Sequence, residues 1–140
     1  MNVGYNMGSA YYHLGKFRKV IESYQKALQI NPQKSEVYSN LFELKLTQKK
    51  PFDEVLERKY IELFQDKREI FIKYEILKIL EALYFDKRYI LSANEWDKKY
   101  QGVGLVDWGW DELDEWIGAM DDSDKKSQLL EAVMVFKGHI

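Results

Sequence analysis

The acidic residues near the end of the chain are the first candidates for chemistry, because nine of them fall within residues 101–140. Most lie in two runs, Asp111–Glu115 and Asp121–Asp124. A calcium loop requires oxygen ligands at alternating positions, followed by a turn glycine and a later glutamate. Lys125 and Lys126 occupy that region instead. Since acidic residues also stabilise the first turn of a helix, we interpret both runs as helix caps or solvated helix faces.

Other catalytic or metal-binding arrangements are equally hard to find. His13 and His139 lie at opposite ends of the chain, whereas a histidine pair that binds a metal on one helix needs a spacing of about four residues. The chain has no cysteine, which excludes disulfides and thiolate metal sites. Gly102-Val-Gly104 is too short for a phosphate loop or a dinucleotide fingerprint. We therefore predict a protein that is not an enzyme, with no catalytic residue, metal or cofactor.

Charge and hydropathy narrow the classes of partner. Residues 1–100 carry 18 basic and 14 acidic side chains, and residues 101–140 carry 3 and 9. Neither part has the concentrated basic stripe that nucleic-acid binding requires. The longest apolar runs, such as Ala132–Phe136, are far shorter than a membrane span, and Met1–Ala10 lacks the pattern of a signal peptide. We expect no nucleic acid and no membrane as partners, and a cytoplasmic location compatible with the lack of cysteine.

Two amphipathic helices are predicted within residues 1–34. Met7, Tyr11 and Leu14 recur at helical spacing before the break at Gly15-Lys16. A second apolar stripe follows, made of Phe17, Val20, Ile21, Tyr24, Ala27 and Leu28. Asn31-Pro32 should end this second helix, because proline disfavours the α-conformation in the residue before it. Two helices joined by so short a link must form an antiparallel hairpin.

The hairpin has a more specific resemblance. Residues Gly4–Gln33 read GYNMGSAYYHLGKFRKVIESYQKALQINPQ, and they resemble a tetratricopeptide repeat. The signature positions of that family for small residues, aromatic residues and proline are matched by Gly8, Tyr11, Tyr24, Ala27 and Pro32. Small residues there allow close crossing of the helix backbones, and the tyrosines fill the space beside them.

Two further copies can be followed along the chain. The second begins at Ser35, with Tyr38, Leu41 and Phe42 at core positions and a second helix from about Phe52 to Phe64. A third pair is expected at Arg68–Phe85 and Lys87–Tyr100, opened by a possible capping box at Asp66–Glu69. Its core positions are Leu83, Tyr89, Ala93 and Trp96.

The pattern changes after the glycine-containing break at Gln101–Gly104. A short helix is marked by Trp108, Trp110, Leu113, Trp116 and Ile117. Ser123 is a candidate cap for a final helix whose apolar face holds Leu129, Leu130, Val133 and Phe136. A stack of repeats needs its apolar end covered. We therefore interpret the hairpin formed by these two helices as a cap on the last repeat. The tryptophans would form a hydrophobic plug or, alternatively, a partner-binding patch.

The predicted fold class is therefore all-α, a right-handed stack of antiparallel helical hairpins similar to a tetratricopeptide-repeat solenoid. About three repeat pairs (residues 1–34, 35–66 and 67–104) make up residues 1–104, and an acidic, tryptophan-rich helical cap occupies residues 105–140. Because Met1 falls at the first position of a repeat, the chain is also a candidate for a piece of a longer array.

The resemblance implies a function and a place for it. In this family the first helix of each pair lines a concave groove that takes a peptide or a partner helix. The corresponding groove positions in this sequence are Tyr5, Ser9, Tyr12 and His13, then Ser39, Asn40, Glu43 and Thr47, then Tyr74, Leu77, Lys78, Glu81 and Tyr84. We expect a non-catalytic adaptor or scaffold that binds a protein or peptide. The alternative is a structural module that forms a homo-oligomer or stacks within a larger repeat assembly.

Overall fold

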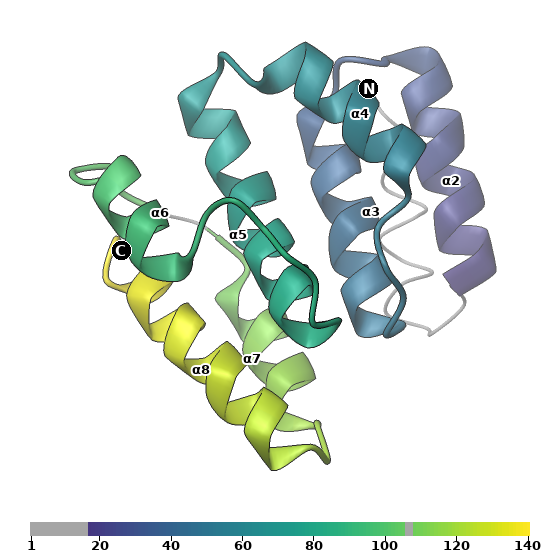
Figure 1. Ribbon diagram of the computed structural model, residues 1–140. Helices are drawn as coiled ribbons and strands as arrows, with labels where there is room; N and C mark the ends of the chain where they lie inside the picture. Colours follow the sequence, from purple (N-terminus) through teal and green to yellow (C-terminus); the bar gives the residue numbers. More distant parts are fainter. Residues whose placement is uncertain (1–16, 106–107) are drawn as a thin grey trace. The chain divides into compact units, whose positions relative to one another are not determined.

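The structure is a computed structural model that describes residues 17–105 and 108–140. Helices follow one another along this part of the chain, which contains no β-strand, and Figure 1 shows their order. They are α2 (Phe17–Ile30), α3 (Ser35–Thr47), α4 (Glu54–Phe64), α5 (Arg68–Tyr84), α6 (Ala93–Lys99), α7 (Trp110–Gly118) and α8 (Ser123–Lys137). The predicted all-α fold class is confirmed.

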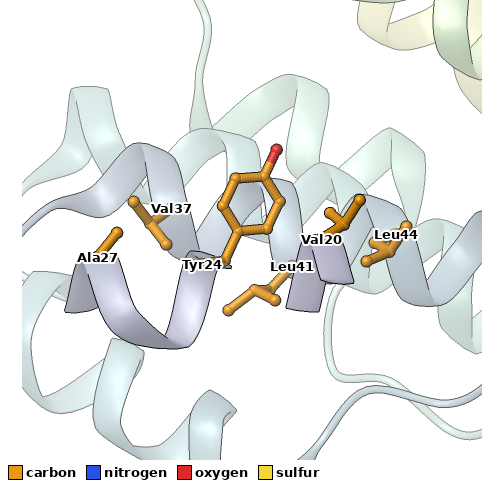
Figure 2. Close-up of a cluster of buried hydrophobic side chains, with 6 residues drawn as sticks. All are labelled: Val20, Tyr24, Ala27, Val37, Leu41 and Leu44. Atoms are coloured by element: carbon orange, nitrogen blue, oxygen red, sulfur yellow. The ribbon is translucent and has the colours of Figure 1, made fainter. Parts of the chain in front are cut away.

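The chain forms two compact units, residues 1–70 and 71–140. In the first unit α2 packs against α3, and α3 packs against α4, so that successive helices run antiparallel (Figure 1). The α2–α3 contact is a cluster of buried side chains: Val20, Tyr24 and Ala27 from α2, and Val37, Leu41 and Leu44 from α3 (Figure 2). The helical stripe predicted for residues 17–28 is therefore the buried face of α2.

The turn between α2 and α3 lies at Asn31-Pro32, where the proline led us to expect the end of the helix. Helix α2 ends at Ile30, and the amide of Asn31 still donates to the carbonyl oxygen of Ala27, at 2.9 Å. The hydroxyl of Tyr38 donates a hydrogen bond of 2.9 Å to the carbonyl oxygen of Pro32. One side chain of α3 thus fixes the link that precedes its own helix.

Aromatic rings fill the space between α3 and α4. The ring centroids of Tyr38 and Tyr60 are 5.4 Å apart, and those of Tyr60 and Phe64 are 4.7 Å apart. Phe42 packs on Phe52 at 4.9 Å. Phe52 is buried although it precedes the helix, which begins two residues later than predicted because the Asp53 side chain accepts hydrogen bonds as its N-cap.

In the second unit α6 is much shorter than predicted. Instead of a helix over Lys87–Tyr100, only Ala93–Lys99 is helical. Ser92 and Glu95 form a capping box that fixes the start of α6, and Asp86 adopts a left-handed conformation (φ 53°) just after α5. Of the predicted core positions Trp96 is fully buried, whereas Leu83, Tyr89 and Ala93 are only partly buried.

The last two helices pair as expected, with local differences. Helix α8 packs against both α6 and α7, and the rings of Phe136 and Trp96 meet edge to face at 4.7 Å. Trp108 lies before α7 rather than within it. The N-cap of α8 is Asp122, not Ser123, because the Asp122 side chain accepts from the Lys125 amide. Leu130, predicted to be on the apolar face, is 40% exposed.

Candidate functional site

Three of the groove positions predicted in the second repeat share one face of α3. Asn40, Glu43 and Thr47 are spaced by three and four residues, which places them in one line along a helix, and all three are partly exposed. The faces of α3 that point toward α2 and α4 are buried, as Val37, Leu41 and Phe42 show. This polar line, hereafter the α3 stripe, is one of the partly exposed polar surfaces of α3.

Ser39 differs from its neighbours in the sequence. It is only 7% exposed, and its hydroxyl forms a side-chain hydrogen bond with Tyr60. Tyr60 in turn donates to the carbonyl oxygen of Ile70 at 3.1 Å. Ser39 thus holds α3 against α4 and the first residues of α5, and it contributes little surface to the α3 stripe.

The groove positions predicted in the third repeat offer less surface. Tyr74 is 3% exposed, and it packs on Phe71 with ring centroids 5.2 Å apart. The Lys78 side chain is 17% exposed. Tyr84 is partly exposed and contacts the rings of Phe85 and Trp116. Tyr5, Ser9, Tyr12 and His13, the positions predicted in the first repeat, lie outside the described residues.

Two glutamates are buried on α5, and each accepts hydrogen bonds from at least one lysine. Oε1 of Glu75 accepts hydrogen bonds of 2.5 Å from Nζ of Lys99 and from the hydroxyl of Tyr100. A buried carboxylate would be costly without such partners. The pairing therefore fixes α6 against α5.

The second buried carboxylate is shared by two lysines. The Glu81 side chain has no exposed surface, and its two oxygens accept from Nζ of Lys78 at 3.0 Å and Nζ of Lys87 at 3.1 Å. Lys87 lies in the non-helical segment after α5, and 41% of its side chain is exposed.

The acidic runs supply one helix cap, residues in the first turn of a helix and one ion-pair partner. Asp111 and Glu112 lie in the first turn of α7, and Asp122 caps α8. Oδ2 of Asp114 pairs with Nζ of Lys137 at 2.6 Å. Within residues 17–105 and 108–140 no group of three histidine, aspartate or glutamate side chains is placed to hold a metal ion. Asp122 as a cap and the exposed acids of α7 agree with the interpretation of the two runs as helix caps or solvated helix faces.

His139 has a structural environment that the sequence did not reveal. Its Nε2 lies 2.6 Å from Oδ1 of Asp97, and its Nδ1 lies 3.1 Å from the carbonyl oxygen of Val103. The ring packs on Trp96 at 4.6 Å. Both ring nitrogens are thus engaged in joining the end of the chain to α6 and the loop that follows it.

The tryptophans are buried in the second unit. Trp108, Trp110 and Trp116 are 7%, 8% and 8% exposed. The rings of Trp108 and Trp110 meet edge to face at 4.3 Å, and Trp116 contacts Tyr84 at 5.7 Å. Side chains with so little exposed surface favour the hydrophobic plug over the partner-binding patch.

The burial of the two glutamates of α5 could have been expected from the sequence, but the repeat pattern favoured another interpretation. Glu75 and Glu81 interrupt an otherwise apolar helix, where ionised side chains are rarely fully buried unless they are paired. Glu81 was instead assigned to the groove by its position in the repeat. Lys78 lies three residues before Glu81 on α5, a spacing that predicts a pair. Lys87 and Lys99 come from outside α5, so that helical spacing does not predict their pairs.

One segment of the chain matches a known protein family. Residues 5–34 match the family model of the tetratricopeptide repeat. The described part of this segment consists of α2 and the turn that follows it. Comparisons with curated proteins and with solved structures found no match. None of the helices in the described part of the chain is both long and apolar enough to cross a membrane.

Proposed function

We propose that this chain, which carries a tetratricopeptide repeat at residues 5–34, is a non-catalytic adaptor that binds a protein or peptide along the first helices of its repeats. Repeats of this family generally mediate protein–protein interaction and scaffolding. The proposal extends to a cytoplasmic setting, with which the lack of cysteine is compatible.

The observation that supports a binding face most directly is the α3 stripe. Asn40 carries an amide, Glu43 a carboxylate and Thr47 a hydroxyl, which donates to the Leu44 carbonyl oxygen at 2.8 Å and can still accept a hydrogen bond. Because α3 packs on α2 and α4 through its other faces, the stripe is carried by a rigid helix. Polar groups held in this way bind an extended peptide with little loss of side-chain entropy.

The test compares two double variants of the intact chain. Asn40→Ala with Glu43→Ala alters the α3 stripe, whereas Lys59→Ala with Glu62→Ala alters exposed positions of the neighbouring helix α4. A partner is first captured with the wild-type chain and identified by mass spectrometry. Its affinity for each purified variant is then measured by calorimetry.

We expect the stripe variant to lose about tenfold or more in affinity, since truncating an interface hot spot costs more than 1 kcal/mol. The α4 variant should bind as the wild type does. Loss of binding in the α4 variant alone would contradict the proposal. A tight homodimer at all concentrations, seen by solution mass, would favour the alternative of a self-associating module.

A further inference from the structure

A cavity of about 370 Å³ lies within the second unit, between α5, residues 87–94 and α8. Aliphatic side chains form much of its wall, among them Ile79, Leu83, Leu91 and Val135. Its size falls within the range of pockets that bind small molecules, about 300–1,000 Å³.

The cavity arises from the late start of α6. After α5 the chain turns at Asp86, and the amide of Lys87 donates to the carbonyl oxygen of Ala82 at 2.8 Å. Residues 87–92 then continue without helical structure until Ser92 caps α6. Tyr89, Leu91 and Ala93 line the cavity from this segment and from the first residue of α6. The cavity therefore lies where residues 87–92, which we expected to be the first turns of a helix, are not helical.

One wall of the cavity carries positive charge. Lys87 lines it, and the same ammonium bonds the fully buried Glu81, which Lys78 also neutralises. An ammonium has three N–H donors; one of those of Lys87 is directed at Glu81. The Lys87 ammonium also lies 5.6 Å from the centre of the Phe85 ring, and its remaining N–H donors favour an anionic group beside Lys87.

A single acidic side chain, Glu131, also lines the cavity. It is exposed on α8, where water screens its charge, whereas the Lys87 ammonium lies against the fully buried Glu81. Gln128, Ser92 and Asn94 supply neutral polar groups. The combination of an aliphatic wall with one cationic group selects for an amphiphilic anion.

We propose that this cavity binds a molecule in which a single carboxylate is joined to an aliphatic chain, the carboxylate at Lys87 and the chain along Ile79, Leu83 and Val135. Free monocarboxylates and chain ends with an aliphatic last residue share this chemistry. Neither the groove nor the repeat match of the chain requires such a site.

The test uses three compounds with the same eight-carbon chain: octanoate, octanol and octylamine. Binding to the full chain is followed by NMR, through the amide signals of Leu91, Ala93 and Ala132 at the cavity. Octanoate should bind about fivefold more tightly than octanol, the gain expected of one partly exposed ion pair, and octylamine should bind most weakly. An acetylated peptide ending in leucine identifies the source: tighter binding than octanoate assigns the site to chain ends, and weaker binding to free monocarboxylates.

Two variants and a control locate the site. Lys87→Met should abolish the preference for octanoate over octanol. Ala93→Phe places a large side chain at a partly exposed lining position and should weaken both compounds. Lys59→Met, which removes an exposed lysine of α4, should change neither. Circular dichroism checks that each variant is folded, and Ala93→Phe provides the test if Lys87→Met does not fold.

The proposal is overturned if octylamine binds more tightly than octanoate, or if none of the three compounds shifts the cavity signals at millimolar concentration. It is also overturned if folded Ala93→Phe binds octanoate with the affinity of the wild type.

Discussion

The hydroxyl of Tyr100 donates a hydrogen bond of 2.5 Å to Oε1 of Glu75, and thereby joins the residue after α6 to the middle of α5. Both side chains are almost fully buried. The ammonium of Lys99 reaches the same oxygen and lies 5.3 Å from the centre of the Tyr100 ring. Helix α6 has only seven residues, and this bond is one of the contacts that hold its C-terminal end on α5.

Tyr100→Phe removes the hydroxyl and leaves the ring. We expect the free energy of unfolding to fall by about 1.5–3 kcal/mol, the contribution of a hydrogen bond to a charged group, measured by urea denaturation. Tyr84→Phe is the matched control, since the Tyr84 hydroxyl has no hydrogen bond within the described residues. Equal stability of both variants and the wild type would show that the Tyr100 bond contributes nothing.

The close packing of α2 on α3 predicts that Ala27 does not tolerate bulk. Ala27 has no exposed surface and lies in the cluster with Val20, Tyr24 and Val37 (Figure 2). Ala27→Leu should destabilise the protein by about 1–3 kcal/mol through overpacking, seen as a lower melting temperature. Gln29→Leu, at an exposed position of the same helix, should leave the melting temperature nearly unchanged. An unaltered melting curve for Ala27→Leu would contradict this packing.

We expect α8 to stabilise the second unit mainly through its buried face, which contains Phe136. Phe136 is fully buried against Trp96, whereas Met134, two residues earlier, is 73% exposed. Phe136→Ala should cost about 3–5 kcal/mol, and Met134→Ala less than about 0.5 kcal/mol. Thermal unfolding followed by circular dichroism distinguishes the two. Similar effects of both substitutions would mean that α8 does not cover the second unit through Phe136.

The parts of the structure that the sequence predicted are those set by local signals. The 3.6-residue period of α2 and the stop at Pro32 are both local, and both lie where expected. The shortened α6 had a local signal too, the Ser92–Glu95 capping box, but the repeat pattern favoured an earlier start. The cavity beside Lys87 was not predictable, because it depends on how α8 packs against α5 and the segment that follows α5.

The same distinction applies to the candidate binding face. The spacing of Asn40, Glu43 and Thr47 places them on one line of α3 from sequence alone. Their exposure, and the burial of Ser39 and Tyr74, depend on neighbouring helices that repeat spacing does not specify.

Burial of Tyr60 predicts a loss of stability at alkaline pH. Burial raises the pKa of Tyr60 above its ordinary value of 10.0, an effect that the Ser39 hydrogen bond reduces and the Glu36 charge increases. A raised folded-state pKa means that above about pH 10 the unfolded chain releases this proton while the folded chain keeps it. Stability from this group is therefore full below pH 10 and declines as the pH rises further.

Tyr60→Phe isolates this effect. At neutral pH the variant should be less stable by about 1 kcal/mol, because it lacks the hydrogen bond to the Ile70 carbonyl. Above pH 10 the deficit should shrink, as only the wild type loses the contribution of Tyr60. Urea denaturation between pH 8 and pH 11 measures it. Thr47→Val, which removes a neutral hydrogen bond to Leu44, should show a deficit independent of pH; a constant deficit for Tyr60→Phe as well would contradict the prediction.

The final prediction separates the proposed groove from the C-terminal tryptophans. By the repeat resemblance Tyr5 and Tyr12 belong to the groove, whereas Trp108 and Trp110 are buried in the second unit. Replacing both tyrosines with alanine should abolish most partner binding with little change in helix content, since truncating an aromatic hot spot costs about 2 kcal/mol or more. Replacing both tryptophans should mainly lower the melting temperature. Calorimetry with the captured partner and circular dichroism give both readouts. If the folded tryptophan variant loses binding and the tyrosine variant keeps it, the binding face lies in the C-terminal unit rather than in the groove.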